Sequence, residues 1–292
     1  MPSIQDNIQK PYGTLYIVAT PLGNLEDMTF RAVRTLQEVD LIAAEDTRHS
    51  KKLLSHYHIT TDIISCHEHN EVKRAEKLIP ILHQGKDIAL ITDAGTPCIS
   101  DPGFRLVTAV LAQNIHVVPI PGCCAVIAGL SAAGLPTDRF LFAGFLPRKH
   151  QQQIRAIQAL APLQATLIFY ESPRRIRALI DQLMAVLGDR QACLAREITK
   201  LHEEFIRGTL SHVMACLDAG TPTKGECTLF LAGAGEPEKL PQQALETLLQ
   251  KRLEQEHGST AMVAKEISCE HKISKKLVYD TIVRLKSCGY GK

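Results

Sequence analysis

Residues 88–103 read IALITDAGTPCISDPG. The first four form a continuous apolar run, which is typical of a strand buried on both faces of a parallel sheet. The loop that follows contains two Gly and two Pro, which impose an unusual backbone path, and Asp93 and Thr96, whose side chains can form hydrogen bonds. Because ligands of open α/β sheets bind beyond the carboxyl ends of the strands, this is a candidate binding loop. A structural loop that caps a helix is the alternative interpretation.

The same alternation of short apolar strands and helices extends over the first 145 residues. Further strands are expected at 15–19, 41–44, 63–64 and 117–120, and helices at 47–57 and 70–83. Another helix is expected to begin at the acidic pair Glu26-Asp27, since acidic residues suit a helix N-terminus. Strands that alternate with helices predict an α/β fold with a parallel sheet covered on both faces.

The length of 292 residues suits two domains and a small appendage. We expect an N-terminal α/β domain at 13–145 and a second α/β domain at 146–235, with strands at 165–170, 192–195 and 228–231. Two short helices near 260–270 and 274–286 predict a helix-turn-helix-like extension at 240–292.

This extension is basic. Residues 251–292 contain nine Lys or Arg against five acidic residues, although the net charge of the whole chain is only +2. A basic tail on a near-neutral body favours a partner that carries phosphates, and a solvated charged face is the alternative.

The composition excludes several classes of protein. Hydrophobic residues make up 45% and charged residues 22%, which is typical of a globular chain and not of a disordered one. The nine Cys include no C-x-x-C pair, which favours reduced thiols in a cytoplasmic protein. We expect no secretory signal and no membrane span, because no apolar stretch reaches roughly 18 residues. Neither G-x-G-x-x-G nor the P-loop pattern occurs, which argues against a dehydrogenase or an NTPase.

Polar side chains follow two further strands. In the segment 45–49, EDTRH, Asp46 is expected to cap the helix that begins at Thr47, whereas Arg48 has the planar geometry that suits phosphate. The segment 67–70, HEHN, has a spacing that a metal ion can use, but no third ligand follows it. We therefore expect polar substrate contacts there and no metal site.

A third polar segment, 170–175, reads YESPRR after a buried strand. Ser172 followed by Pro173 predicts the start of a helix. Arg174 and Arg175 would then lie in its first turn, where positive charge opposes the helix dipole unless an anion lies nearby. This segment is therefore a second candidate for binding phosphate.

Six segments occur in an order that resembles one family: PLGNL at 21–25, AEDTR at 44–48, HEHN at 67–70, the loop 93–103, YES at 170–172 and ARE at 195–197. The chain resembles the ribosomal small subunit methyltransferase I family, the bacterial 16S rRNA cytidine-2′-O-methyltransferases of the tetrapyrrole methylase superfamily. The likeness covers about residues 13–232. One departure is PGCCA at 121–125, where the family more often has Pro after Gly.

The resemblance implies two α/β domains of tetrapyrrole-methylase type, with S-adenosylmethionine in the cleft between them, and a cytoplasmic homodimer. It implies methyl transfer to the ribose 2′-oxygen of a decoding-centre cytidine of 16S rRNA, within the small ribosomal subunit, with no metal and no membrane partner. The residues implied to contact the cofactor are Leu22, Asp93, Gly95, Thr96, Cys124, Ala125 and Tyr170.

This reaction requires a group that accepts the proton of the hydroxyl. The candidates are Glu45, His67 and Glu171, and the sequence does not decide between them. The residues expected to contact the substrate are Arg48, His69, Asn70, Arg174 and Arg175. The alternatives are a tetrapyrrole methylase of cobalamin synthesis, a diphthine synthase, and a non-catalytic RNA-binding assembly factor. The segments 45–48 and 67–70 and the basic tail argue against the first two, and the intact loop 93–103 argues against the third.

Overall fold

The computed structural model describes residues 12–220, 225–235, 242–255, 260–270 and 274–287. The chain divides into two compact units. The first comprises residues 1–161 and 165–233 and contains two five-stranded sheets. The second comprises 162–164 and 234–292 and contains three helices in its described part. Because both sheets belong to one unit, the expected domain boundary at residue 145 stays a prediction.

The first sheet is parallel throughout, as the apolar runs predict. Its strand order is β3-β2-β4-β1-β5. The strands are β1 (Thr14–Val18), β2 (Leu41–Ala44), β3 (Ile63–Ser65), β4 (Ile88–Ile91) and β5 (His116–Ile120). All four residues of β4 are buried, and this strand lies in the middle of the sheet.

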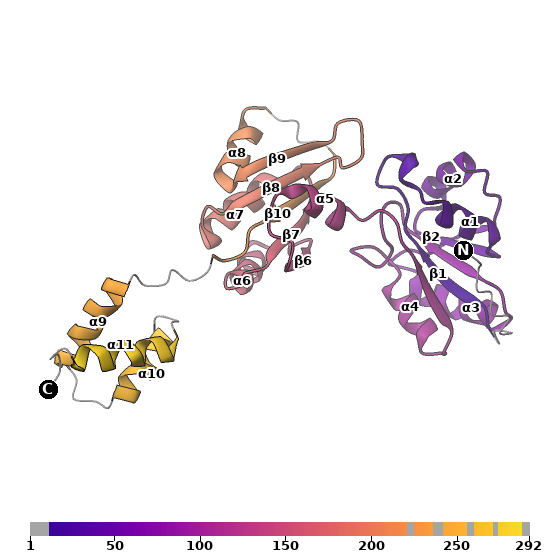
Figure 1. The fold of residues 1–292 in the computed structure, drawn as a ribbon. Coiled ribbons are helices and arrows are strands. Elements are labelled where there is room, and N and C mark those ends of the chain that lie inside the picture. Colours follow the sequence, from indigo (N-terminus) through magenta and orange to yellow (C-terminus); the bar gives the residue numbers. More distant parts are fainter. Residues whose placement is uncertain (1–11, 221–224, 236–241, 256–259, 271–273, 288–292) are drawn as a thin grey trace, which may run out of the picture. The chain divides into compact units, whose positions relative to one another are not determined.

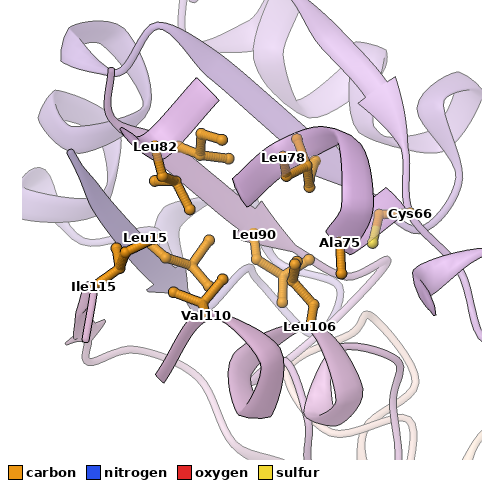
Figure 2. Close-up of a cluster of buried hydrophobic side chains, with 11 residues drawn as sticks. Leu15, Cys66, Ala75, Leu78, Leu82, Leu90, Leu106, Val110 and Ile115 are labelled. Carbon is orange, nitrogen blue, oxygen red and sulfur yellow. The ribbon is translucent and has the colours of Figure 1, made fainter. Parts of the chain in front are cut away.

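Helices cover both faces of this sheet (Figure 1). They are α1 (Phe30–Glu38) and α2 (Thr47–His56) on one face, and α3 (Glu71–His83) and α4 (Phe104–Leu111) on the other. Successive side chains of a strand point to opposite faces. Leu90 therefore packs with Leu78 and Leu106 of α3 and α4 (Figure 2), whereas Ile91 packs with Leu36 of α1.

The expected helix start at Glu26-Asp27 is wrong. These two residues belong to a 3₁₀ helix, η1 (Leu25–Asp27), and α1 begins at Phe30. The Thr29 hydroxyl accepts a hydrogen bond from the Ala32 N–H at 3.1 Å and so caps α1. A Thr cap satisfies an N-terminal N–H directly, which fixes the helix start more strongly than acidic residues do.

The second sheet is mixed, with the order β6-β7-β10-β8-β9. Its strands are β6 (Phe140–Gly144), β7 (Thr166–Glu171), β8 (Gln191–Arg196), β9 (Glu204–Thr209) and β10 (Cys227–Leu231). Only the pair β6–β7 is parallel. The expected strands correspond to β7, β8 and β10, and the structure adds β6 and β9 at the two edges.

Helix α5 (Ala125–Ala133) follows β5 directly but packs on this second sheet. Val126 and Leu130 lie against Phe230 of β10. A Cβ on Gly129 would come within 2.4 Å of the Phe230 ring, so glycine is what permits this close approach. The remaining helices of the unit are α6 (His150–Leu160), α7 (Ile176–Leu187) and α8 (Leu210–Asp218).

The second unit contains α9 (Gln242–Gln255), α10 (Thr260–Glu270) and α11 (Lys275–Ser287). Leu249, Ile267 and Ile282, one from each helix, are fully buried in a shared core. Helices α10 and α11 match the expected pair, and α9 was not expected. Lys272 and Lys292 of the basic tail lie outside the described residues. Within the described ranges, no helix is long and apolar enough to cross a membrane.

Candidate active site

A cavity of about 420 Å³ lies where the carboxyl ends of the first sheet's strands meet residues of β7 and β10. We call it the main cavity, and its volume is in the range of small-molecule sites. All the residues implied to contact the cofactor line it, namely Leu22, Asp93, Gly95, Thr96, Cys124, Ala125 and Tyr170. Glu45 and Glu171 line it as well. The sequence therefore selects residues that the fold brings together, and their contact with a cofactor stays a prediction.

The loop after β4 has a strained backbone. Gly95 and Gly103 have φ values of +80° and +127°, and the non-glycine residues Cys98 and Ser100 have φ values of +72° and +65°. Left-handed backbone at non-glycine residues costs free energy and persists only where the surroundings enforce it. Here the buried Glu71 carboxylate accepts a hydrogen bond from the Gly103 N–H at 2.9 Å. Such strain is typical of a binding loop.

Backbone contacts join this loop to neighbouring segments. Gly95 and Thr20 exchange two N–H···O bonds of 2.9 Å each, which anchor the loop beside the end of β1. The Thr96 hydroxyl donates to the Cys123 carbonyl at 3.0 Å and so fixes the loop to the segment before α5. The Cys124 side chain does not cap α5, and the Val126 N–H in the first turn of this helix interacts with the Tyr170 hydroxyl beside the cavity.

The charge of the main cavity is distinctive. Five acidic residues line it, Glu45, Asp93, Asp101, Glu171 and Glu226, and its described lining contains no Lys, Arg or His. Burial, with a further contribution from the Glu45 charge, raises the pKa of Asp101 to about 7. Burial is also the main cause that raises the pKa of Glu45. Carboxyl groups that are costly to ionise gain stability from a cation, so the cavity favours a positively charged ligand over a phosphate-rich one.

Asp101 is absent from the site residues that the sequence indicates. It lies eight positions after Asp93 in an Asp-Pro-Gly turn. Asp, Pro and Gly are common turn residues, so a turn alone accounts for this sequence. Asp101 reaches the main cavity because the backbone at Cys98 and Ser100 has positive φ, which the sequence does not indicate. The only available signal was the presence of a second Asp within the loop.

A second cavity, of about 490 Å³, adjoins the main one. We call it the neighbouring cavity. Glu45, Ser100 and Asp101 line both cavities, and His67 and His69 line only the neighbouring one.

The three candidate proton acceptors therefore differ in their environments. Glu45 lies at the junction of the two cavities, where its carboxylate accepts a hydrogen bond from the Asp93 N–H at 3.3 Å. Glu171 is 1% exposed and forms an ion pair of 3.0 Å with Arg175. His67 lies in the neighbouring cavity alone.

Asn70 fixes the position of His67. Its Oδ1 accepts a hydrogen bond from the His67 backbone N–H at 2.9 Å, and its Nδ2 lies 2.9 Å from His67 Nε2. The ring of His69 lies 6.1 Å from that of His67, measured between centroids. Across the described residues, no three His, Cys, Asp or Glu side chains are grouped as a metal site requires.

The three candidate phosphate-binding arginines differ in their exposure and in their ion pairs. Arg48 is 90% exposed and forms an ion pair of 2.7 Å with Asp46, and this guanidinium holds the pKa of Asp46 well below its usual range. As expected, Asp46 caps α2 by accepting a hydrogen bond from the Arg48 N–H at 2.8 Å. Arg174 is exposed, whereas Arg175 is half-buried in its ion pair with Glu171.

The expected start of a helix at Ser172-Pro173 is wrong. Helix α7 begins at Ile176, and the Ser172 carbonyl accepts the N–H groups of Arg175 and Ile176 in a preceding turn. Arg174 and Arg175 therefore precede the first turn, and the ion pair with Glu171 accounts for the charge of Arg175 without a phosphate.

Comparisons with known proteins show the family to which this sequence is similar. The family of tetrapyrrole (corrin/porphyrin) methylases matches residues 14–214. A protein of Halalkalibacterium halodurans named ribosomal RNA small subunit methyltransferase I is 51% identical over 224 residues, 77% of each chain. A protein of the same name from Synechocystis is 48% identical over 95% of this chain and 100% of its own.

Solved structures show the same fold. The uroporphyrin-III C-methyltransferase of Thermus thermophilus, solved with S-adenosylhomocysteine, matches with a TM-score of 0.53 at 18% identity. The match covers 75% of this chain and 97% of that one. The identity to the Synechocystis protein extends over nearly the whole chain, and the family model matches residues 14–214. Together they show the family of this chain. The chain belongs to the tetrapyrrole methylase family and, within it, to the ribosomal RNA small subunit methyltransferase I family.

Proposed function

We propose that this methyltransferase transfers a methyl group to the ribose 2′-oxygen of a cytidine in the decoding centre of 16S rRNA. The observation that carries the proposal is the acidic main cavity, which joins a second, open cavity at Glu45. The main cavity suits a cationic donor, and the neighbouring cavity leaves room for the RNA beside it. A cytoplasmic homodimer that acts on the small ribosomal subunit is part of the same proposal.

The methyl donor is S-adenosylmethionine, which supplies a methyl group on a positively charged sulfonium. The main cavity fits such a molecule, because Asp101 has a raised pKa and gains from a nearby positive charge. Leu22, Ile99 and Tyr170 provide apolar surface beside these acids. The N-terminus of α5 carries a partial positive charge, which suits a carboxylate. We propose that the residues named for the cofactor hold it there.

Glu45 is the best supported proton acceptor. It borders both cavities, and its raised pKa brings it closer to the neutral pH at which a general base works best. Glu171 is less suitable because its ion pair with Arg175 stabilises the charge that must accept a proton. His67 lies farther from the main cavity and remains the second candidate.

The choice of RNA as substrate rests on the relatives. Proteins 51% and 48% identical to this chain are named ribosomal RNA methyltransferases, whereas the likeness to a uroporphyrin methylase at 18% identity shows the fold alone. We propose that His69, Asn70 and Arg174 contact the RNA. Arg48 is exposed and can contact it as well. Arg175 can contact the RNA only if its ion pair with Glu171 opens.

Methyl transfer into small subunits tests this function. The full-length protein is incubated with labelled S-adenosylmethionine and with subunits from a strain that lacks the corresponding gene, and the labelled nucleoside is mapped. We expect one 2′-O-methylcytidine. Label in another nucleoside would refute the cytidine assignment, and RNA binding without any label would favour a non-catalytic assembly factor.

A further inference from the structure

An aromatic ring lies at the opening of the main cavity. Phe145 lines this cavity and is nevertheless 58% exposed. Aromatic residues make up only 5% of the chain, so an exposed ring at the site is informative. Among the other exposed aromatic residues of the described chain, Phe104 lines the neighbouring cavity, and Phe30, Phe140 and Tyr279 line neither cavity.

Phe145 contacts the ring of Tyr170, which in turn contacts the ring of Phe142. The centroid of the Phe145 ring lies 5.7 Å from that of Tyr170, with an angle of 61° between the ring planes. The Phe142 ring lies 4.8 Å from Tyr170 on an edge-to-face contact of 70°. Phe142 and Tyr170 pack against the buried core beneath α5. The exposed ring is therefore the outer end of a row that is anchored in the core.

The backbone at the end of β6 departs from regular strand geometry just before Phe145. The pairing of β6 with β7 shifts register between Phe142 and Gly144, and Gly144 has a φ of +63°. A Cβ at Gly144 would lie 3.3 Å from Ser100 Oγ, so the strand end passes close to the loop 93–103. Bulges of this kind redirect side chains at active sites. Here the bulge brings Phe145 to the cavity instead of continuing the strand.

Two free cations follow the ring along the chain. Arg148 and Lys149 are exposed, and neither forms an ion pair with any acid in the described part of the chain. Lys149 is the N-cap residue of α6. An extended chain of four residues spans at most about 14 Å. A single RNA strand that contacts Phe145 can therefore also contact both cations with neighbouring phosphates.

We propose that Phe145 is a stacking platform for the base of the nucleotide that receives the methyl group, and that Arg148 and Lys149 bind the phosphates next to it. The inference rests on the proposed function and identifies how the RNA is held. A nucleotide that leaves a stacked strand to enter a cavity loses its base stacking. Stacking on an aromatic ring compensates for the base stacking that is lost, and it works with any base.

Fluorescence of a stacked base tests the platform. The probe is a short single-stranded RNA with a fluorescent cytidine analogue at its centre, added to the full-length protein saturated with S-adenosylhomocysteine. We expect binding to quench the fluorescence of the wild type. Phe145→Ala should lose this quenching and bind the RNA about tenfold more weakly, which is the size of one lost stacking contact. Phe145→Trp should retain both.

Controls separate stacking from other roles of the ring. Phe30→Ala removes a ring that is 97% exposed on α1, and this variant should bind and quench as the wild type does. Because Phe145 packs on Tyr170, affinity for S-adenosylhomocysteine is measured by calorimetry as well, and Phe145→Ala should lose less affinity for it than for the RNA. Quenching retained in Phe145→Ala, no quenching in the wild type, or a loss of cofactor affinity with RNA affinity intact would each overturn the proposal.

Salt dependence tests the two cations. Replacing both Arg148 and Lys149 with Ala should reduce the slope of log affinity against log salt by about 0.7 for each cation removed, and Phe145→Ala should leave the slope unchanged. An unchanged slope in the double variant would remove the cations from the proposal. Because these are binding measurements, they distinguish failure of the platform from failure of methyl transfer, which the nucleoside mapping reports.

Discussion

The Glu45 carboxylate accepts a hydrogen bond from the Asp93 N–H at 3.3 Å. This contact connects the carboxyl ends of the neighbouring strands β2 and β4 at the place where the two cavities meet. A general base at this junction is positioned by the backbone of the loop 93–103, which also lines the main cavity. Glu45 can therefore act on a substrate while the loop holds the donor.

Glu45→Gln should lower kcat by about 10² to 10⁴, because the amide keeps the shape but cannot accept the proton. The base must be ionised to work. The rate of the wild type should therefore rise with pH through a pKa above that of an ordinary Glu, and the variant should lose this rise. Single-turnover rates across pH check both points. Glu76→Gln, on the exposed face of α3, is the matched control, and an equal loss there would contradict the assignment.

Cofactor affinity should depend on pH through Asp101. Its pKa of about 7 means that the carboxyl is partly protonated at neutral pH. A cation binds the ionised form better, so the Kd for S-adenosylmethionine should fall as the pH rises from 6 to 8. Asp101→Asn should weaken binding about tenfold, the equivalent of one pKa unit, and remove this dependence. Calorimetry measures both, with the exposed Asp138→Asn as control. A pH-independent Kd in the wild type would argue against the charge interaction.

The same carboxyl should cost the apo protein stability. The folded-state pKa of Asp101 is about 7 and its ordinary value is 3.8, so ionisation opposes folding increasingly as the pH rises from 3.8 to 7 and constantly above that. Asp101→Asn should therefore raise Tm at pH 8, by about 2 to 4 °C for each kcal/mol gained, and change it little at pH 4. Thermal unfolding without cofactor gives the comparison. A Tm that falls at pH 8 would show that the carboxylate is stabilised in the fold.

Gly129→Ala should destabilise the contact between α5 and β10. Alanine normally favours a helix over glycine, but its Cβ would lie 2.4 Å from the Phe230 ring. Overpacking of this kind costs about 1 to 3 kcal/mol. The midpoint of urea unfolding measures the loss, and Ser131→Ala on the exposed side of α5 serves as control. A more stable Gly129→Ala variant would mean that the sheet adjusts to the methyl group.

The sequence predicts those strands and helices whose burial requires apolar residues at regular positions. Strand β4 is recognisable because all four of its residues are buried, so an apolar run is required. Strand β9 lies at a sheet edge and reads EFIRGT, in which only Ile206 is buried, and such a strand carries little signal. The ends of the strands were predictable as a site because parallel strands collect their carboxyl ends at one edge. Asp101 and Phe145 were not, because a strained loop and a bulge bring them to the cavity.

Replacing Lys275 and Lys276 with Ala should weaken RNA binding. Both are exposed at the start of α11, so their removal leaves the core formed by Leu249, Ile267 and Ile282 intact. If they bind phosphates, the slope of log affinity against log salt should fall, and cofactor affinity should stay the same. Filter binding at several salt concentrations checks this, with Lys73→Ala/Lys77→Ala on the exposed face of α3 as the control of equal charge. An identical slope in both variants would show that the basic C-terminal helices are only a solvated face, and that the RNA is held by the first unit alone.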